Sequence, residues 1–316
     1  MKVLFFGTGS IGKRHCVNLK KLMPHADLYF FRDTGKKDSF SEQVNAKILS
    51  SVEQITEDID AAFFCAPAYT RKKCYEKIIQ HNIPLYAEKP LISNMADLIW
   101  LKAQLTSSSY TAVSLVGFNL RFLNVIRTVK EILFSNKLGN VCRASFDVGQ
   151  YLPDWRPGID YRTLYSAQKS KEGGVILDLM HEIDLAYFLF GSFSDASIVR
   201  NKFSNLEIDT EDTAAIILHR ASAPIVTINM DYVARKKMRH FNIIGDQATL
   251  SCDLINNSLV IEGQNLVEEF SLGGDGEKCT YIAALEEFLS AIKERKVTSY
   301  PLMDSIPMHE LILARI

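Results

Sequence analysis

Residues 2–12 read KVLFFGTGSIG. An apolar run is followed there by a G-x-G-x-x-G pattern made by Gly7, Gly9 and Gly12, and residues 11–22 continue with an amphipathic helical pattern. A strand that ends on such a turn and opens into a helix presents backbone N–H groups to a pyrophosphate. The stretch therefore predicts a dinucleotide-binding site rather than a chance glycine turn. The cofactor contacts expected in it are Gly7, Gly9, Ser10, Ile11 and Gly12.

The length and charge of the chain narrow its class. Its 316 residues are enough for two domains. Lys and Arg number 36 and Asp and Glu 37, so no basic surface of the kind that binds nucleic acid is expected. No apolar run approaches the roughly 18 to 20 residues that span a bilayer, and the first residues do not resemble a leader. We expect no nucleic-acid or membrane partner and a cytoplasmic location.

Six cysteines are scattered along the chain without a C-x-x-C pair. This spacing is not typical of a zinc-thiolate site or of a disulfide framework. We expect reduced thiols, mostly in the core.

The N-terminal part of the sequence alternates short apolar runs with helical patterns. Such alternation is typical of parallel strands joined by crossover helices. We therefore expect an α/β fold that begins with a doubly wound Rossmann domain over residues 1–120. The strands predicted in it are residues 3–6, 28–31, 61–66, 85–87 and 113–118.

From about residue 141 the pattern changes to longer strands separated by turns, which favours a mainly antiparallel open sheet. We expect residues 121–316 to form an α+β domain for substrate binding and oligomerisation. Its predicted strands are residues 141–148, 214–219, 225–232, 241–244 and 258–262, and its last helices are residues 281–293 and 303–316.

The residue at the end of the second strand distinguishes the two nicotinamide dinucleotides. A carboxylate there holds the ribose 2′-hydroxyl of NAD, whereas an arginine accepts the 2′-phosphate of NADP. The chain has Arg32 followed by Asp33, with Lys36 and Lys37 just beyond. The positive charge favours NADP. NAD, with its ribose held by Asp33, remains open. In a further alternative, this segment is a solvated turn without a cofactor role.

Lys89 lies in Ala87-Glu88-Lys89-Pro90, at the end of a predicted parallel strand. Ligands bind at this edge of such sheets. Desolvation and neighbouring charge can lower the pKa of a lysine there and let it exchange a proton with a substrate hydroxyl. The alternative is an exposed surface lysine.

A second candidate site follows Gly173 and Gly174, in the segment 175–190 with helical spacing. Asp178 and His181 are three residues apart, so a continuous helix would stack them on one face. A carboxylate and an imidazole together suit hydroxyl binding and proton transfer. In the alternatives, Asp184 or Glu182 is an exposed helix residue and His181 a satisfied core residue. No second histidine is placed to complete a metal site, and we expect no metal.

Taken together and in this order, these elements resemble the glucose-fructose oxidoreductase, inositol 2-dehydrogenase and MocA family of NAD(P)-dependent oxidoreductases. The resemblance covers nearly the whole chain, and E-K-P is its most specific motif. The motifs that carry it are GTGSIGKRH at 7–15, CAP at 65–67, EKP at 88–90, GFNLRF at 117–122, and GG at 173–174 with Asp178 and His181.

The resemblance implies roles for particular residues. The lysine, aspartate and histidine of such enzymes face the nicotinamide and the substrate hydroxyl, which places these catalytic roles on Lys89, Asp178 and His181. A homo-oligomer, either a dimer or a tetramer, is also implied. The further implied cofactor contacts are Ala66, Pro67, Glu88, Lys89 and Asn119, and the implied substrate contacts are Lys89, Arg121, Asp178 and His181.

The chain departs from the family pattern in two places. Many members space the aspartate and histidine by four residues, whereas Asp178 and His181 differ by three. Many members also have a histidine four residues beyond the proline of the third predicted strand, where this chain has Arg71. The first difference leaves the identity of the base open, and the second predicts a lost or changed role at the cofactor edge.

Residues 150–174 form a long polar and aromatic stretch without periodicity, as expected of a binding loop. Its first part, 150–162, looks like a branch of the family associated with bacterial surface-sugar biosynthesis. Arg156 and Arg162 could clamp a carboxylate or phosphate, and the rings of Trp155, Tyr161 and Tyr165 could cover a sugar face. This favours an acidic or nucleotide-linked sugar as substrate. In the alternative, the two arginines pair with Asp154 and Asp160 and hold the loop.

The sequence predicts an NAD(P)-dependent oxidoreductase that transfers a hydride between the nicotinamide and a carbinol of a sugar, a sugar derivative or a polyol. Lys89 and His181 would share proton transfer, and Asp178 would orient the hydroxyl. Two other functions remain open. One is a glycosidase that uses a tightly held NAD for transient oxidation, and the other is a cofactor-binding sensor without turnover.

Overall fold

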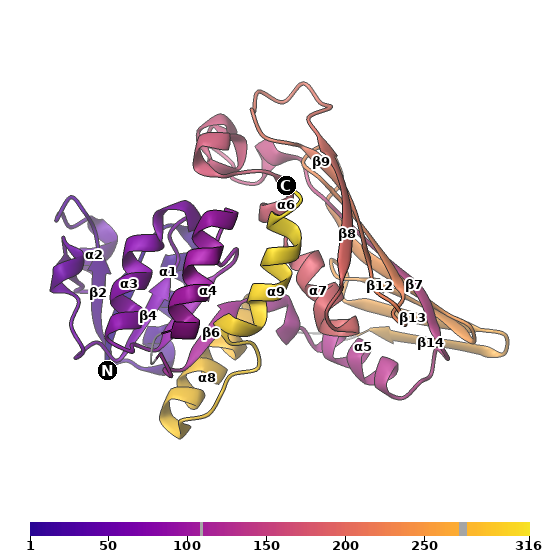
Figure 1. The fold of residues 1–316 in the computed structure, drawn as a ribbon, viewed down its shortest axis with the longest axis horizontal. Coiled ribbons are helices and arrows are strands. Elements are labelled where there is room, and N and C mark those ends of the chain that lie inside the picture. Colours follow the sequence, from indigo (N-terminus) through magenta and orange to yellow (C-terminus); the bar gives the residue numbers. More distant parts are fainter. Residues whose placement is uncertain (108–109, 272–276) are drawn as a thin grey trace. The chain divides into compact units, whose positions relative to one another are not determined.

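A computed structural model describes residues 1–107, 110–271 and 277–316 (Figure 1). The chain forms two compact units. The first contains Met1–Phe118 and Tyr281–His309, and the second contains Asn119–Thr280 and Glu310–Ile316. All of residues 121–316 were expected in the second domain, so the return of Tyr281–His309 to the first unit is a structural finding.

The first unit contains a parallel sheet, which confirms the predicted Rossmann architecture. Its strand order is β3-β2-β1-β4-β5-β6, and every pairing is parallel. Because the chain moves outward from β1 in both directions, the carboxyl ends of β1 and β4 form the switch point at which such sheets bind ligands. The strands are β1 (Lys2–Phe6), β2 (Asp27–Phe31), β3 (Lys47–Leu49), β4 (Ala61–Phe64), β5 (Leu85–Glu88) and β6 (Ser114–Gly117).

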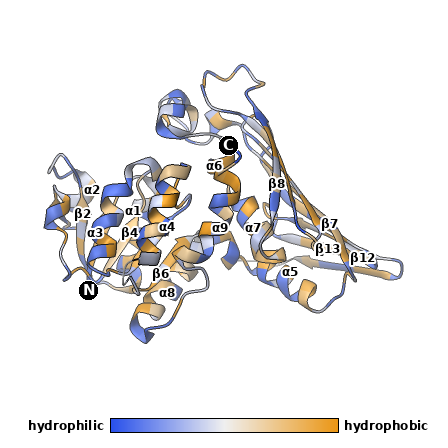
Figure 2. Cartoon of the chain, viewed as in Figure 1, coloured by the Kyte–Doolittle hydropathy of each residue, from blue (hydrophilic) through white to orange (hydrophobic). Residues whose placement is uncertain are grey.

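Amphipathic character is clearest in one helix of the first unit. In α3 (Lys72–Gln80) the buried residues Cys74, Tyr75, Ile78 and Ile79 recur at helical spacing. Figure 2 accordingly shows hydrophobic and hydrophilic residues side by side along this helix. The other helices that lie in this unit wholly or in part are α1 (Ser10–Leu22), α2 (Ser39–Gln43), α4 (Met95–Ser107), α8 (Glu277–Glu294) and α9 (Leu302–Leu313).

Aromatic packing explains why the late segment belongs to the first unit. Phe5, Phe63 and Tyr86 from three neighbouring strands stack on one another in the core. Phe288 of α8 is fully buried and meets the rings of Phe63 and Tyr86 edge-on, with centroids 5.7 and 5.8 Å away. This helix completes the core of the parallel sheet, which a reading of local patterns alone does not reveal.

The second unit is built on a sheet of order β14-β13-β12-β11-β7-β10-β9-β8. The pairing of β7 with β10 is parallel and all the others are antiparallel, which confirms the predicted mainly antiparallel sheet. Its strands are β7 (Val141–Gly149), β8 (Asp195–Asn201), β9 (Thr213–His219), β10 (Ile225–Asp231), β11 (Met238–Gly245), β12 (Ala248–Asp253), β13 (Ser258–Gly263) and β14 (Leu266–Ser271).

One face of this sheet is covered by helices. Burial alternates along the strands, as in β9, where Ala214, Ile216 and Leu218 are buried and the residues between them are not. Helices α6 (Val175–Asp178) and α7 (His181–Phe190) pack against the buried face (Figure 1). Helix α5 (Asn124–Phe134) belongs to the same unit.

The helix expected over residues 175–190 is interrupted. Helix α6 (Val175–Asp178) ends before Leu179, whose φ of −100° and ψ of 27° leave the helical region, and α7 (His181–Phe190) begins after Met180. Asp178 therefore ends one helix and His181 starts the next, so the expected stacking of the two on one continuous helix was wrong. None of the helices in the described ranges is long and apolar enough to cross a membrane.

Candidate functional site

Gly7 and Gly12 let the turn after β1 close tightly. Gly7 has φ +88°, and a Cβ added to it would lie 2.5 Å from the backbone nitrogen of Ala66, which follows β4. A Cβ on Gly12 would lie 2.1 Å from the carbonyl oxygen of Gly7. The first glycine thus allows two strand ends to meet, and the second allows the helix to pack on the strand.

Gly9 is different, because a Cβ added to it would meet no atom within 4 Å. It is also the N-cap of α1, where no side chain caps the helix. The first N–H groups of the helix therefore point into open space beside the switch point, where an anion can replace the cap. This arrangement fits the pyrophosphate of a dinucleotide.

Arg32 is held beside the glycine turn. Its guanidinium donates to the hydroxyl of Thr8 at 2.9 Å and pairs with Asp38 at 2.7 Å. This pairing lowers the pKa of Asp38 to about 2. Asp33 is exposed. The structure thus puts Arg32, rather than Asp33, in contact with the turn.

Glu88 and His15 form a buried pair at the carboxyl end of β5. The Glu88 carboxylate lies 2.6 Å from Nε2 of His15, which comes from α1, and both side chains are buried. The side chain of Glu88, expected among the cofactor contacts, is therefore bonded inside the protein and fixes the start of the E-K-P loop.

Arg71, the residue directly before α3, binds the same loop. It is buried and donates to the carbonyl of Ala66 at 2.7 Å and to the carbonyls of Glu88 and Pro90 at 2.5 and 2.8 Å. The last two carbonyls flank Lys89, which is half-buried. At the position where many family members have a histidine, this chain thus has a cation that ties the end of β4 to the loop carrying Lys89.

His309 of α9 binds the far end of the loop. Its Nδ1 lies 2.8 Å from the carbonyl of Ser305, so Nδ1 carries the proton and Nε2 accepts from the N–H of Leu91 at 3.1 Å. Tyr75 donates to the carbonyl of Leu91. Complete burial lowers the pKa of His309 to about 4, and the imidazole is neutral at pH 7.

This low pKa predicts an acid-sensitive first unit. The imidazole has a pKa near 6.5 when unfolded and about 4 when folded, so acidification between these values protonates the unfolded chain first and lowers the free energy of unfolding. Between pH 7 and pH 5, this group should lower the free energy of unfolding by about 2 kcal/mol. His309→Gln, whose amide oxygen can still accept from Leu91, should lose less stability over that range in urea titrations. An equal loss in both proteins would contradict the assignment.

Asp178 in the second unit accepts hydrogen bonds from two tyrosines. The hydroxyl of Tyr165 donates to one carboxylate oxygen, and that of Tyr232 donates to the other at 2.6 Å. Burial and the Asp178 charge raise the pKa of both hydroxyls well above the usual value, so both remain protonated donors. Tyr165 was predicted as a substrate contact, whereas Tyr232 was missed.

Gly173 and Gly174 bring this group together. A Cβ on Gly173 would lie 1.9 Å from the carbonyl oxygen of Tyr165, and one on Gly174, at φ +134°, would lie 2.3 Å from Oε1 of Glu211. The glycine pair therefore allows the Tyr165 backbone and a second carboxylate to approach α6. Burial raises the pKa of Glu211.

Two further carboxylates of α7 are buried in ion pairs. Asp184 accepts from Nε and Nη2 of Arg121 at 2.8 and 2.6 Å, and Glu182 lies 2.7 Å from Nε of Arg239. Neither is an exposed helix residue, so the alternative in which Asp184 or Glu182 is exposed was wrong. Arg121, expected to bind substrate, has two N–H groups engaged here, which favours a structural role. His181, beside them at the start of α7, is buried.

The two loop arginines differ. Arg162 binds Asp160 through two N–H groups and Glu207 through a third, as in the alternative in which it holds the loop. Arg156 is exposed, and within the described part of the chain neither Asp154 nor Asp160 pairs with it. Of the two arginines expected to form one clamp, Arg162 is thus bonded to carboxylates of the chain and Arg156 is not.

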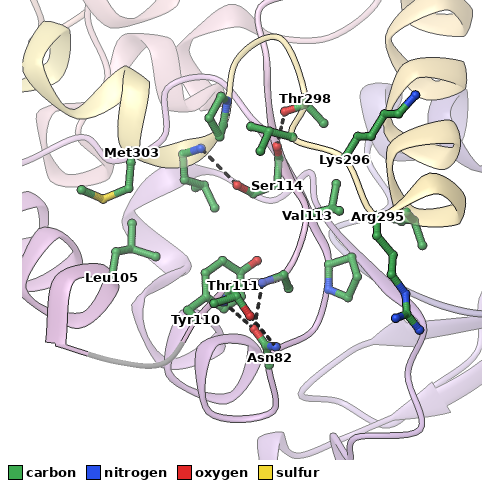
Figure 3. Close-up of a pocket in the computed structure, with 16 residues that line it drawn as sticks. Asn82, Leu105, Tyr110, Thr111, Val113, Ser114, Arg295, Lys296, Thr298 and Met303 are labelled. Carbon is green, nitrogen blue, oxygen red and sulfur yellow. Dashed lines mark hydrogen bonds between the residues drawn. The ribbon is translucent and has the colours of Figure 1, made fainter.

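The first unit also contains a cavity of about 660 Å³ (Figure 3). Its lining includes Pro84 and Val113, which precede β5 and β6, so it opens at the amino edge of the sheet. Its Asn82 side chain accepts from the N–H groups of Thr111 and Ala112, both at 2.9 Å. The cavity is therefore separate from the glycine turn at the carboxyl edge.

Comparison with known families gives two matches that cover most of the chain. Residues 1–114 match the family described as oxidoreductase family, NAD-binding Rossmann fold. Residues 126–251 match the GFO/IDH/MocA C-terminal domain.

Individual relatives are distant. Glucose-6-phosphate 3-dehydrogenase of Bacillus subtilis (strain 168) is 22% identical over 220 residues, 69% of this chain and 61% of that protein. 2,7-Anhydro-N-acetylneuraminate hydratase of Mediterraneibacter gnavus is 20% identical over 193 residues, 60% of this chain and 49% of that protein. The match thus spans only about half to three-fifths of these relatives' lengths.

Solved structures share the fold over the whole chain. An oxidoreductase from Agrobacterium radiobacter, in complex with NAD+, L-tartaric acid and magnesium, has a TM-score of 0.85 at 18% identity, covering 100% of this chain and 95% of that one. Levoglucosan dehydrogenase in complex with NADH has a TM-score of 0.83 at 17% identity, covering 99% of this chain and 97% of that one.

Proposed function

Because this chain belongs to the GFO/IDH/MocA family of oxidoreductases, we propose that it transfers a hydride between a nicotinamide cofactor and a carbinol of a sugar, a sugar derivative or a polyol. The observation that carries the proposal is the glycine turn, in which Gly9 leaves open space in front of an uncapped helix N-terminus. A bound nicotinamide supplies the hydride acceptor or donor at C4.

The cofactor would be held by the residues of the carboxyl edge in the first unit. Backbone N–H groups of the turn bind the pyrophosphate, and Ala66 and Pro67 border it at the end of β4. Lys89, between the two carbonyls that Arg71 holds, is the proposed group that exchanges a proton with the reacting hydroxyl through Nζ.

In the second unit, the Asp178 group is the proposed hydroxyl-binding site. Its carboxylate, held by Tyr165 and Tyr232, accepts a further hydrogen bond from the substrate and orients it. His181 is proposed to share proton transfer, and the Trp155 ring, which meets Tyr232 edge-on, offers an apolar surface to a sugar ring. Relatives named for glucose 6-phosphate and levoglucosan support the sugar class.

We infer a preference for NADP from Arg32. Its contact with Thr8 keeps a guanidinium beside the turn, where it can bind a 2′-phosphate. Arg32→Ala should weaken NADPH binding by roughly 10- to 100-fold, as expected for a lost charged hydrogen bond, and leave NADH within about threefold. If instead Asp33→Ala weakens NADH and Arg32→Ala changes neither, the cofactor is NAD held through the ribose.

A sugar panel tests the reaction itself. Purified protein is incubated with NAD+ or NADP+ and neutral, phosphorylated and carboxylated sugars, and the absorbance of the reduced nicotinamide is followed together with sugar products. Net reduction supports the proposal. A changed sugar without net reduction indicates transient oxidation, as expected of the alternative glycosidase. Cofactor binding without any product indicates a sensor. The homo-oligomer and the cytoplasmic location remain predictions.

A further inference from the structure

Arg156 and Arg235 are exposed arginines of the second unit. Within residues 1–107, 110–271 and 277–316, no carboxylate or carbonyl is bonded to either guanidinium. Arg162, on the same loop as Arg156, shows the opposite case, because Asp160 and Glu207 occupy its N–H groups. The first two guanidinium groups are thus available to an anion from outside the chain.

Arg156 lies near Asp178 and the two tyrosine hydroxyls that bind it. It directly follows Trp155, whose ring centroid is 5.2 Å from that of Tyr232, and Tyr232 donates to Asp178. Burial and the Asp178 charge raise the pKa of Tyr165, and the positive charge of Arg156 opposes that rise. Arg156 is therefore within electrostatic reach of the residues proposed to bind the substrate hydroxyl.

Arg235 is held in place by an aromatic ring. It stands in the turn between β10 and β11, and its guanidinium carbon lies 3.6 Å from the ring centroid of Tyr151. The next residue, Leu152, donates its N–H to the carbonyl of Tyr232 at 2.9 Å. Tyr151 thus belongs to the segment whose backbone is hydrogen-bonded to Tyr232. A contact with the ring face leaves the N–H groups of the guanidinium available to an oxyanion.

Exposed lysines add positive charge beside Arg235. Lys236 and Lys237 follow Arg235 and are exposed. Asp231, at the start of the turn, accepts hydrogen bonds from two backbone N–H groups of the turn itself. Asp154 adds one exposed negative charge beside Arg156. The loop and the turn thus carry four exposed cations, and Asp154 is the exposed carboxylate next to Arg156.

We propose that Arg156 and Arg235 form an oxyanion subsite that binds a phosphate or carboxylate group carried by the sugar substrate. Planar guanidinium groups bind both anions in a bidentate manner. The inference rests on the proposed function, since it describes a second contact of the same substrate. It assigns the substrate to the acidic sugars and gives the anion contact to the β10–β11 turn rather than to Arg162.

Binding measurements on the NADPH-saturated protein test the subsite. The probes are glucose 6-phosphate, UDP and glucuronate, which represent a phosphate monoester, a nucleoside diphosphate and a carboxylate. Glucose is the neutral probe, and all four are measured at the same ionic strength. At least one anion should bind ten times or more tightly than glucose. Arg156→Met and Arg235→Met should each weaken that binding by roughly 10- to 100-fold. The saturating cofactor keeps the probes out of the glycine turn.

Arg143→Met is the matched control. Arg143 is exposed on β7, which pairs with β10 so that Arg143 lies opposite Ile225 at the strand end distant from Tyr232. It should bind the anion within about twofold of the wild type, a change too small to represent a lost charged hydrogen bond. Melting temperatures show that each variant is folded.

The possible results separate the two proposals. Failure of the wild type to bind either NADPH or NADH overturns the proposed function. Binding of NADPH without any preference for the anions over glucose overturns the subsite alone, as does an anion affinity that survives both Arg156→Met and Arg235→Met. The anion that binds best identifies the substrate's acidic group.

Discussion

Lys89→Met should lower kcat for the sugar identified by the panel by about 10²- to 10⁴-fold, the range typical of a lost acid–base group. Met retains the length and stem of the side chain but has no proton to exchange. The E-K-P loop should keep its position, because His15 and Arg71 bind Glu88 and the two carbonyls around Lys89 rather than the lysine itself. NADPH binding should therefore stay within about threefold. Steady-state kinetics and a fluorescence titration measure the two quantities.

Lys73→Met provides the control for this variant, because Lys73 is an exposed lysine on α3. It should leave kcat unchanged. If Lys89→Met retains kcat within a few-fold, or if it loses cofactor binding while single-turnover chemistry persists, the assigned role of Lys89 is wrong.

Asp178→Asn should lower kcat/KM for the sugar by about 10²- to 10³-fold. Its carboxylate accepts from two tyrosine hydroxyls and is proposed to accept a third hydrogen bond from the substrate. An amide presents one oxygen and an NH₂ group, so at least one of these three donors loses its acceptor. A lost charged hydrogen bond alone accounts for about 2 to 3 kcal/mol, and the misplaced hydroxyl adds to this.

Tyr232→Phe should cause a smaller loss in kcat/KM than Asp178→Asn. The remaining hydroxyl of Tyr165 still binds Asp178, so the loss in kcat/KM should be about tenfold, with NADPH affinity unchanged. Stability is followed in parallel by urea unfolding, because Tyr232 is fully buried. Wild-type kcat/KM in Asp178→Asn would remove the second unit's proposed part in the reaction.

Most of the fold could be predicted because its central strands have clear patterns. Strands with little apolar alternation were missed. Both β3 and β8 lie at sheet edges, and β8 (DASIVRN) has only one fully buried residue, so no periodic pattern marks it. In β12, the inward-facing residues are Ala248, Leu250 and Cys252, two of which are small and give a weak signal.

The site was predicted where its residues lie in a motif. Asp178 and Tyr165 lie close together in sequence, but the second hydroxyl on Asp178 comes from Tyr232, 54 positions away. A tyrosine at the end of an apolar strand, whose buried hydroxyl needs an acceptor, was the available signal. Arg71 was marked by its departure from the family pattern. His309 had no signal, because its role depends on the return of α9 residues to the first unit.

The glycine turn can be tested by filling its open space. Gly9 has φ −68° and ψ −166°, which a valine adopts readily, and a Cβ there meets no protein atom within 4 Å. Gly9→Val should therefore fold with an unchanged melting temperature while its side chain occupies the place proposed for the pyrophosphate.

A fluorescence titration of wild type and Gly9→Val with NADPH and NADH, after removal of bound nucleotide, is the most direct test of the account. We expect the wild type to bind, with NADPH favoured, and Gly9→Val to bind at least 100-fold more weakly with both, a loss of about 2.7 kcal/mol or more. Equal binding by the two proteins would contradict the proposed cofactor site, and binding of neither nucleotide by the wild type would contradict the oxidoreductase function.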